Sequence, residues 1–161
     1  MISVIQTLIK EQPVRFGGLV AFGLLAGAYG FQFAGYPPCE MCWWQRYPYM
    51  AVIALTLLSI LTKTDKSRWV LLLVTLLFAT DASIAIFHAG VEQKWWEGFT
   101  SCSSGLDLTG NIEDALAAIN AAPVVRCDEI PWSLFSISMA GYNAIIAVGM
   151  TIYGAVQLKR S

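Results

Sequence analysis

Two cysteines separated by two residues, Cys39 and Cys42, are the first candidates for chemistry in this chain of 161 residues. A disulfide that closes so small a loop removes little entropy from the unfolded chain, so it would stabilise the fold only weakly. Redox chemistry suits the spacing better, because the two thiols can join and separate with little backbone movement. A helix beginning beside them would stabilise a thiolate, and Arg46 would add a cation one helical turn after Cys42.

Pro48 complicates this geometry, because a proline cannot donate a hydrogen bond to the carbonyl group of Trp44. The helix is expected either to kink at Pro48 or to begin later. If Arg46 precedes the regular helix, it no longer lies one turn from Cys42.

The other two cysteines, Cys102 and Cys127, are 25 positions apart in a polar stretch. A structural disulfide and a second redox pair both remain open for them, and four cysteines allow three pairings. A structural zinc site is disfavoured, because such sites usually draw on two closely spaced pairs of ligands.

The composition indicates which elements position these residues. Hydrophobic residues make up 57% of the chain and charged residues 13%, against about 25% charged in average soluble chains. A formal net charge of −1 excludes a nucleic-acid binder with a basic face. We expect an all-α integral membrane protein, a single domain over residues 1–161. Its four transmembrane helices are predicted at about 16–36, 43–62, 69–90 and 132–157.

The basic residues predict the orientation of the bundle. Four spans place both termini on one side, which carries Lys10, Arg15, Lys63, Lys66, Arg68, Lys159 and Arg160, whereas the other side carries only Arg46, Lys94 and Arg126. Basic residues mark the cytoplasmic face, so the loops at about 37–42 and 91–131 are expected to face outward. All four cysteines then lie in an oxidising compartment. Asn111 begins a predicted short interfacial helix within the long outer loop.

Small and aromatic residues suggest how the helices pack. Aromatic residues, with Tyr49 among them, cluster near the outer ends of the spans and are interpreted as an interfacial belt. Gly23 and Gly27 form a GxxxG pair in the first helix, and Ser136, Ala140 and Ala144 form a stripe in the fourth. Both patterns predict close approach between helices.

Oxidation of thiols on the outer side would release electrons that need an acceptor. No cysteine reaches the cytoplasmic side, no Rossmann fingerprint is present, and no CxxCH haem motif occurs. The single histidine excludes a bis-histidine haem. By elimination, a quinone dissolved in the lipid remains as the acceptor. It could meet Cys39 and Cys42, because this pair is expected at the membrane surface.

The segments Pro-Cys-Glu-Met-Cys-Trp-Trp-Gln-Arg (38–46) and Cys-Asp-Glu-Ile-Pro-Trp (127–132) resemble the bacterial disulfide bond formation protein B (DsbB) family, and the similarity extends over essentially the whole chain. This resemblance implies a four-helix enzyme of the bacterial inner membrane. Such an enzyme reoxidises a periplasmic thioredoxin-like dithiol oxidase of the DsbA type and passes electrons to ubiquinone or menaquinone.

The resemblance also implies roles for individual residues. Cys39 and Cys42 would be the quinone-coupled pair, with the Cys42 thiolate in contact with the quinone. Cys102 would be attacked by the partner's thiolate, and Cys127 would be its disulfide mate that then attacks Cys39. Arg46 and His88 would be quinone-binding residues, with Arg46 supporting reduction of the quinone and His88, near the outer end of the third span, lying close to it. Pro48 and the adjacent tryptophans depart from the best-known members of the family.

Asp81 lies near the middle of the third predicted span, where an ionised carboxylate is costly. We expect it to be protonated and bonded to a neighbouring helix through Asn143 or Tyr142. A proton path from Asp81 to His88, seven positions later on the same face, is the alternative.

Two other functions stay open beside a dithiol:quinone oxidoreductase. One is a non-catalytic membrane module, stapled by disulfides, that docks a periplasmic partner. The other is an isoform dedicated to a single client oxidase.

Overall fold

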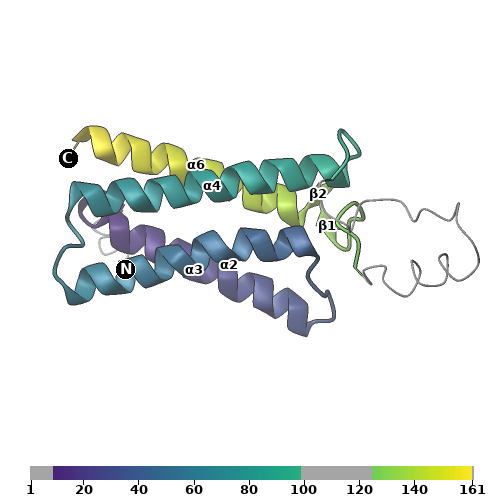
Figure 1. The fold of residues 1–161 in the computed structure, drawn as a ribbon, viewed down its shortest axis with the longest axis horizontal. Coiled ribbons are helices and arrows are strands. Elements are labelled where there is room, and N and C mark those ends of the chain that lie inside the picture. The colour runs from purple at the N-terminus through teal and green to yellow at the C-terminus, as the bar shows by residue number, and fades with distance from the viewer. Residues whose placement is uncertain (1–8, 99–124, 161) are drawn as a thin grey trace, which may run out of the picture.

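The computed structural model describes residues 9–98 and 125–160. Most of these residues belong to four helices, α2 (Pro13–Phe33), α3 (Glu40–Leu61), α4 (Arg68–Glu92) and α6 (Met139–Arg160). Figure 1 shows an elongated bundle in which the α2–α3 connection and the segment before α6 lie at one end. We call this the cysteine end, because Cys39, Cys42 and Cys127 lie there. The α3–α4 connection and the end of α6 lie at the opposite, terminal end (Figure 1).

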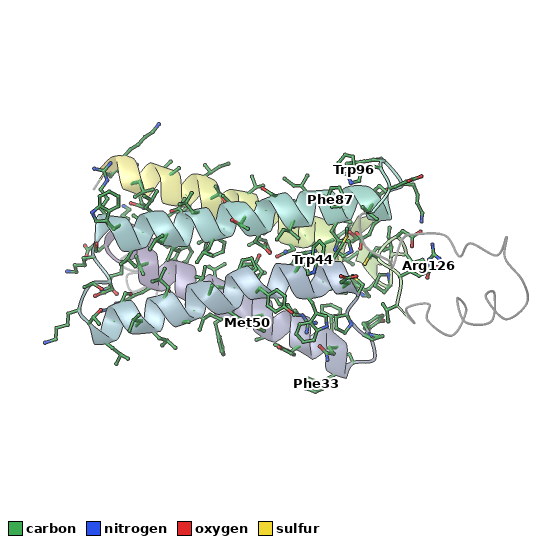
Figure 2. All side chains as sticks on the ribbon, viewed as in Figure 1. Phe33, Trp44, Met50, Phe87, Trp96 and Arg126 are labelled. Atoms are coloured by element: carbon green, nitrogen blue, oxygen red, sulfur yellow. The ribbon has the colours of Figure 1, made fainter. Side chains whose placement is uncertain are left out.

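Three of the helices, α2, α4 and α6, are long and apolar enough to cross a membrane. Helix α3 is of similar length, but Glu40, Gln45 and Arg46 make its first half more polar. That α3 also crosses the membrane stays a prediction. Large apolar side chains cover much of the bundle surface, and Phe33 and Trp44 are examples in Figure 2. The predicted helix after Asn111 lies outside the described residues.

The connection between α2 and α3 places Cys39 at a helix start. Gly35 follows α2 with φ of +98°, and the N–H of Tyr36 donates to the carbonyl of Phe31, which closes the helix. Pro37 and Pro38 cannot continue a helix, and the chain is extended at Cys39 before α3 begins at Glu40.

Helix α3 continues through Pro48 without ending. Arg46 therefore lies within the regular helix, four residues after Cys42, and the predicted one-turn spacing between them is confirmed. The helix starts before Arg46, so the possibility of a later start is wrong.

A small hairpin precedes the last helix. Strands β1 (Ser133–Leu134) and β2 (Ile137–Ser138) pair antiparallel, and the turn between them has positive φ at Phe135 and Ser136. Ser138 then caps α6 by accepting the N–H of Gly141 at 3.1 Å. The helix consequently begins at Met139, later than the predicted start near residue 132.

Close helix contacts lie toward the terminal end and not at the predicted GxxxG pair. A Cβ atom on Gly18 would lie 2.6 Å from Thr56, and one on Gly154 would lie 2.3 Å from the Thr75 hydroxyl. By contrast, a Cβ on Gly23 or Gly27 would meet nothing within 4 Å. The expectation that this pair brings helices together is therefore wrong, because these glycines face open space.

The core has two parts. The larger contains Tyr49, Phe78 and their neighbours from all four helices, and it fills the middle and the terminal end of the bundle. The smaller consists of Cys39, Met41, Val91 and Cys127 at the cysteine end. Tyr49 is thus buried in the bundle, whereas its place in the sequence suggested an interfacial aromatic residue.

Candidate functional site

Cys39 caps the N-terminus of α3 with its own sulfur. The backbone N–H of Cys42 donates to Cys39 Sγ at 3.2 Å, so the thiol takes the place that a serine or aspartate side chain usually fills. The two sulfur atoms lie 2.8 Å apart, with the Cys39 thiol donating to Cys42. This bond stabilises negative charge on Cys42, which is the more accessible of the two.

Cys127 joins this pair from a distant part of the chain. It is completely buried and its thiol is hydrogen-bonded to that of Cys39. This bond, the bond to Cys42 and burial together raise the pKa of the Cys39 thiol above its ordinary value. In this arrangement the Cys39 thiol therefore stays protonated, between the sulfurs of Cys42 and Cys127. Cys102 lies outside the described residues.

Ion pairs hold the Cys127 segment against the end of α4. Lys94 Nζ lies 2.5 Å from the Asp128 carboxylate and 2.7 Å from its backbone carbonyl oxygen, and Arg126 Nη2 donates to the same carboxylate at 2.8 Å. These cations lower the pKa of Asp128, the Arg126 guanidinium most of all. A carboxylate that stays ionised next to Cys127 thus ties it to α4.

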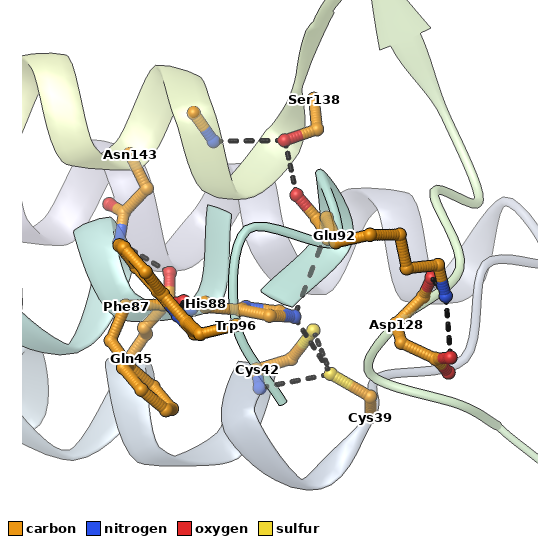
Figure 3. A network of polar contacts seen from close by, with 12 residues as sticks. Cys39, Cys42, Gln45, Phe87, His88, Glu92, Trp96, Asp128, Ser138 and Asn143 are labelled. Carbon is orange, nitrogen blue, oxygen red and sulfur yellow. Dashed lines mark hydrogen bonds and ion pairs between the residues drawn. The ribbon is translucent and has the colours of Figure 1, made fainter. Parts of the chain in front are cut away.

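His88 connects the sulfurs to the interior of the bundle (Figure 3). Its Nε2 atom lies 3.5 Å from Cys39 Sγ, and its Nδ1 atom lies 2.6 Å from Gln45 Nε2. On the other side, Nε2 lies 3.9 Å from the Glu92 carboxylate, which in turn accepts a hydrogen bond from Ser138. The ring is buried on every side, so its orientation is fixed by these contacts.

Arg46 is a buried cation held without an acidic partner among the described residues. Only 5% of its surface is exposed. Its guanidinium donates to Gln32 Oε1 at 2.6 Å and to the Ala28 carbonyl at 3.3 Å, and it lies 4.7 Å from the ring centroids of both Tyr29 and Trp43. The positive charge is therefore positioned by neutral groups and is left uncompensated.

A cavity of about 710 Å³ opens beside these residues. One wall is the apolar face of α2 with Gly23 and Gly27, where the absent side chains leave room. The opposite wall is polar and contains Cys39, Cys42, Gln45, Arg46, Tyr49, His88 and Asn143. Its volume and its mixture of apolar surface with a few polar groups are typical of small-molecule sites.

Behind the polar wall lies Asp81, which is 0% exposed. Its Oδ2 atom is 2.6 Å from the Tyr49 hydroxyl and 3.0 Å from Asn143 Nδ2. Asn143 Nδ2 also donates to Gln45 Oε1 at 2.7 Å, which links Asp81 to the histidine. The expected bond from Asp81 to Asn143 on a neighbouring helix is confirmed.

Comparison with known proteins identifies the family to which this chain belongs. The model of the disulfide bond formation protein DsbB family matches residues 11–157. The chain belongs to the DsbB family. Membership implies a membrane protein of disulfide bond formation with thiol–disulfide oxidoreductase activity, and the apolar helices agree with a place in the bacterial inner membrane.

The chain is also similar to individual proteins from two organisms. The chain is 30% identical over 108 residues to disulfide bond formation protein B of Cupriavidus necator, covering 66% of this chain and 63% of that protein. It is 25% identical over 121 residues to an uncharacterized protein of Rickettsia prowazekii, covering 73% of this chain and 69% of that protein. No solved structure matches the chain.

The site residues predicted for this DsbB family member lie together as far as they are described. Cys39, Cys42 and Cys127 form one cluster, and His88 touches it, whereas Arg46 lies on the cavity wall one turn beyond Cys42. Sequence reasoning missed Gln45, Glu92 and Tyr49 as members of the site. A polar residue next to Arg46 in an apolar segment was the signal available for Gln45.

Cys39, Cys42 and His88 also form a set that could hold a metal ion, because one ligand atom from each lies within 4.8 Å of the others. Two thiolates and an imidazole suit zinc or copper. Zn–S bonds of about 2.3 Å in a tetrahedral site would keep two sulfurs about 3.8 Å apart. The sulfurs here are 2.8 Å apart, which fits direct contact between thiols better.

Proposed function

We propose that this chain is a protein-dithiol:quinone oxidoreductase. It reoxidises a periplasmic thioredoxin-like dithiol oxidase of the DsbA type and passes the electrons to a membrane quinone, ubiquinone or menaquinone. The observation that carries the proposal is the contact of three cysteine sulfurs from two distant segments, two of which, those of Cys39 and Cys42, belong to residues that line one cavity.

The proposed relay moves electrons inward from the partner and a disulfide outward to it. The partner's thiolate attacks Cys102 in a Cys102–Cys127 disulfide, and the released Cys127 thiolate attacks Cys39 in a Cys39–Cys42 disulfide. The partner's second thiolate then displaces Cys102 from the partner, and the released Cys102 thiolate attacks Cys127, which re-forms the Cys102–Cys127 disulfide and frees Cys39. The partner's two thiols are thereby oxidised to a disulfide, and Cys39 and Cys42 hold the two electrons. The hydrogen bond between Cys127 and Cys39 supports the second exchange, because the two sulfurs are already adjacent.

The residues around the cavity fit a quinone. Its apolar α2 wall suits a ring with a lipid tail, and Arg46 with His88 supplies polar groups for ring oxygens. When bound, a quinone supplies a sink for two electrons and two protons. Arg46 would hold it by a positive charge that no described acidic residue neutralises, and Cys42 would face it from the same wall.

The orientation of the molecule is part of this proposal. Both termini are placed in the cytoplasm and the cysteine end in the periplasm of a bacterium. The terminal end, which carries most of the basic residues, would then face inward. Thiols at the cysteine end would meet the partner in the oxidising compartment.

The test is a coupled assay with purified full-length protein, a soluble quinone analogue and a reduced thioredoxin-like partner. We expect loss of quinone to match oxidation of the partner one to one, and Cys42→Ser to abolish both. Asp65→Asn, at the terminal end, serves as the control and should retain activity. Partner binding without quinone loss would contradict the proposal and favour the non-catalytic docking module.

A further inference from the structure

The hydrogen bonds around Asp81 indicate which protons are present inside the bundle. The Oδ1 atom of Asp81 is buried and has no hydrogen-bond partner among the residues that the structure describes, whereas Oδ2 contacts Tyr49 and Asn143. An ionised carboxylate would carry negative charge on both oxygens, and a bare charged oxygen in an apolar interior is very costly. A neutral carboxylic acid fits, with its proton on Oδ2 and its weakly accepting carbonyl oxygen at Oδ1.

A count of hydrogens leads to the same protonation state. Five contacts join Asp81, Tyr49, Asn143, Gln45 and His88. If Asp81 is ionised, the Tyr49 hydroxyl offers one hydrogen, the Asn143 amide offers two and the Gln45 amide offers one toward His88. These four hydrogens can fill only four of the five contacts. The nitrogen and oxygen atoms of both amides can also be exchanged, with the His88 hydrogen placed on Nδ1. In that assignment too, one contact has no hydrogen. Either way, the fifth hydrogen must come from Asp81.

The position of this acid relative to the cavity suggests what its proton does. Asp81 does not line the cavity, but Tyr49, Asn143, Gln45 and His88 do. Tyr49 lines the cavity, and its hydroxyl lies 2.6 Å from Asp81 Oδ2. It is therefore the one O–H group among these five residues that can pass a proton from the buried acid to a molecule in the cavity.

We propose that Tyr49 and Asp81 form an internal proton donor, in which Tyr49 releases a proton at the cavity wall and Asp81 replaces it. This proposal rests on the proposed function, because it assigns the proton side of that same reaction. Asn143 and Gln45 act as positioning residues. They hold the hydroxyl and His88 in place by amide hydrogen bonds.

The proton and electron balance is complete within the proposed reaction. Joining Cys39 to Cys42 forms one S–S bond, breaks two S–H bonds and releases two electrons and two protons. The lipid-soluble quinone takes up two electrons and two protons, so no net proton is required. The thiol protons leave at sulfur, whereas Tyr49 supplies one at the cavity wall. One thiol proton goes to the second quinone oxygen, and the other returns to Asp81 through the Tyr49 hydroxyl after the product leaves.

The first test does not use the quinone. Infrared spectra of the full-length protein in detergent at neutral pH should contain the C=O stretching band of a protonated carboxylic acid. We expect Asp81→Asn to remove intensity from this band and Asp65→Asn, whose carboxylate pairs with Arg15, to leave it unchanged. Glu92 is also buried, so the assignment depends on the loss in Asp81→Asn. An unchanged band in Asp81→Asn would overturn the proposal.

The second test measures quinone-dependent oxidation of the Cys39–Cys42 thiols in H₂O and D₂O. Loss of a general acid typically costs roughly 100-fold or more in rate, so we expect Tyr49→Phe and Asp81→Asn to be at least tenfold slower, with an altered solvent isotope effect. Thiol–disulfide exchange with the partner, without quinone, should be unchanged in both variants. Tyr153→Phe, at the terminal end, is the matched control.

The outcomes separate the two proposals. If the wild-type protein reduces no quinone, the proposed function fails and the donor role fails with it. If the wild type is active and Tyr49→Phe has the same rate and isotope effect, only the donor role is overturned. A variant that has also lost partner exchange would indicate misfolding. The donor role is then decided by the infrared band.

Discussion

A buried arginine that has no acidic partner in the described part of the chain bears on what the cavity can bind. Arg46 is held by the Gln32 amide, the Ala28 carbonyl and two aromatic rings, so its charge is positioned but not neutralised. Taking a cation out of water is unfavourable unless other groups interact with it. An electron-rich oxygen in the cavity would supply the missing interaction, and this is the physical basis for placing a quinone beside Arg46.

Replacing this guanidinium should weaken quinone binding. A hydrogen bond to a charged group is worth about 1.5–3 kcal/mol, so Arg46→Gln should raise the KM for a quinone analogue roughly tenfold or more. Arg46→Lys should lie between, because an ammonium group does not reproduce the planar contact with both rings. Arg15→Gln, at the terminal end, is the control. An unchanged KM in Arg46→Gln would exclude this role.

Spacing along the chain predicted the chemical residues but not their partners. The pair Cys39 and Cys42 and the position of Arg46 follow from local sequence, because one helix start positions all three. The bonds from Asn143 to Tyr49 and to Gln45 join residues 94 and 98 positions apart. Such contacts depend on how α3 and α6 pack. Tyr49 therefore looked like an interfacial aromatic in the sequence.

At the scale of the helices, the two halves of α2 have different surroundings. Near the terminal end, Gly17 and Gly18 let α4 and α3 approach, whereas Gly23 and Gly27 line the cavity. The sequence showed the glycines but not which of them contact a helix, because spacing along one helix does not indicate which of its faces meets a neighbour. The shape of the cavity is therefore a property of the crossing of α2 with its neighbours.

Two glycine substitutions should separate packing from cavity. In Gly18→Ala the new methyl group would lie 2.6 Å from Thr56, and such overpacking typically costs about 1–3 kcal/mol. In Gly23→Ala the methyl group meets nothing within 4 Å, and alanine favours the helix by about 1 kcal/mol. Thermal unfolding in detergent should show a lower Tm for Gly18→Ala only. Equal Tm values in the two variants would contradict the described packing.

The ion pairs around Asp128 should make the hold on Cys127 dependent on pH. The pKa of Asp128 is lowered in the fold by Arg126 and Lys94, so these pairs stabilise the segment above the ordinary aspartate pKa near ~4. That stability is lost as the pH falls toward the lowered value. Exposed ion pairs each contribute only weakly, so we expect a severalfold effect on local opening of the segment.

Hydrogen exchange of residues 125–130 is the measurement for this effect. We expect Asp128→Asn to speed exchange of this segment severalfold at neutral pH and to leave the middle of α4 unchanged. The wild-type protein should approach the variant as the pH is lowered below 4, after correction for the intrinsic exchange rate. If the variant and the wild type exchange equally at neutral pH, the ion pairs do not hold the segment.

For the whole molecule, the two ends have different chemistry. The cysteine end holds the sulfur cluster, beside the cavity that residues of α2 and α6 help to line, and the terminal end holds most of the cations. Composition alone predicted an α-helical membrane bundle, because long apolar segments have few other stable solutions. The hairpin before α6 was not predicted, since Phe135 and Ser136 adopt a turn that usually requires glycine or asparagine.

The proposed direction of electron flow requires these ends to lie on opposite sides of the membrane. Glu97 and Lys66 are both exposed, in loops at the cysteine end and the terminal end respectively. With the native cysteines replaced by serine, Glu97→Cys should react with a membrane-impermeant maleimide in spheroplasts. Lys66→Cys should react only after lysis, because the proposed orientation, which follows the excess of basic residues at that end, places it in the cytoplasm. The reverse pattern would leave the cysteine cluster in a reducing compartment, where a periplasmic dithiol could not reach it.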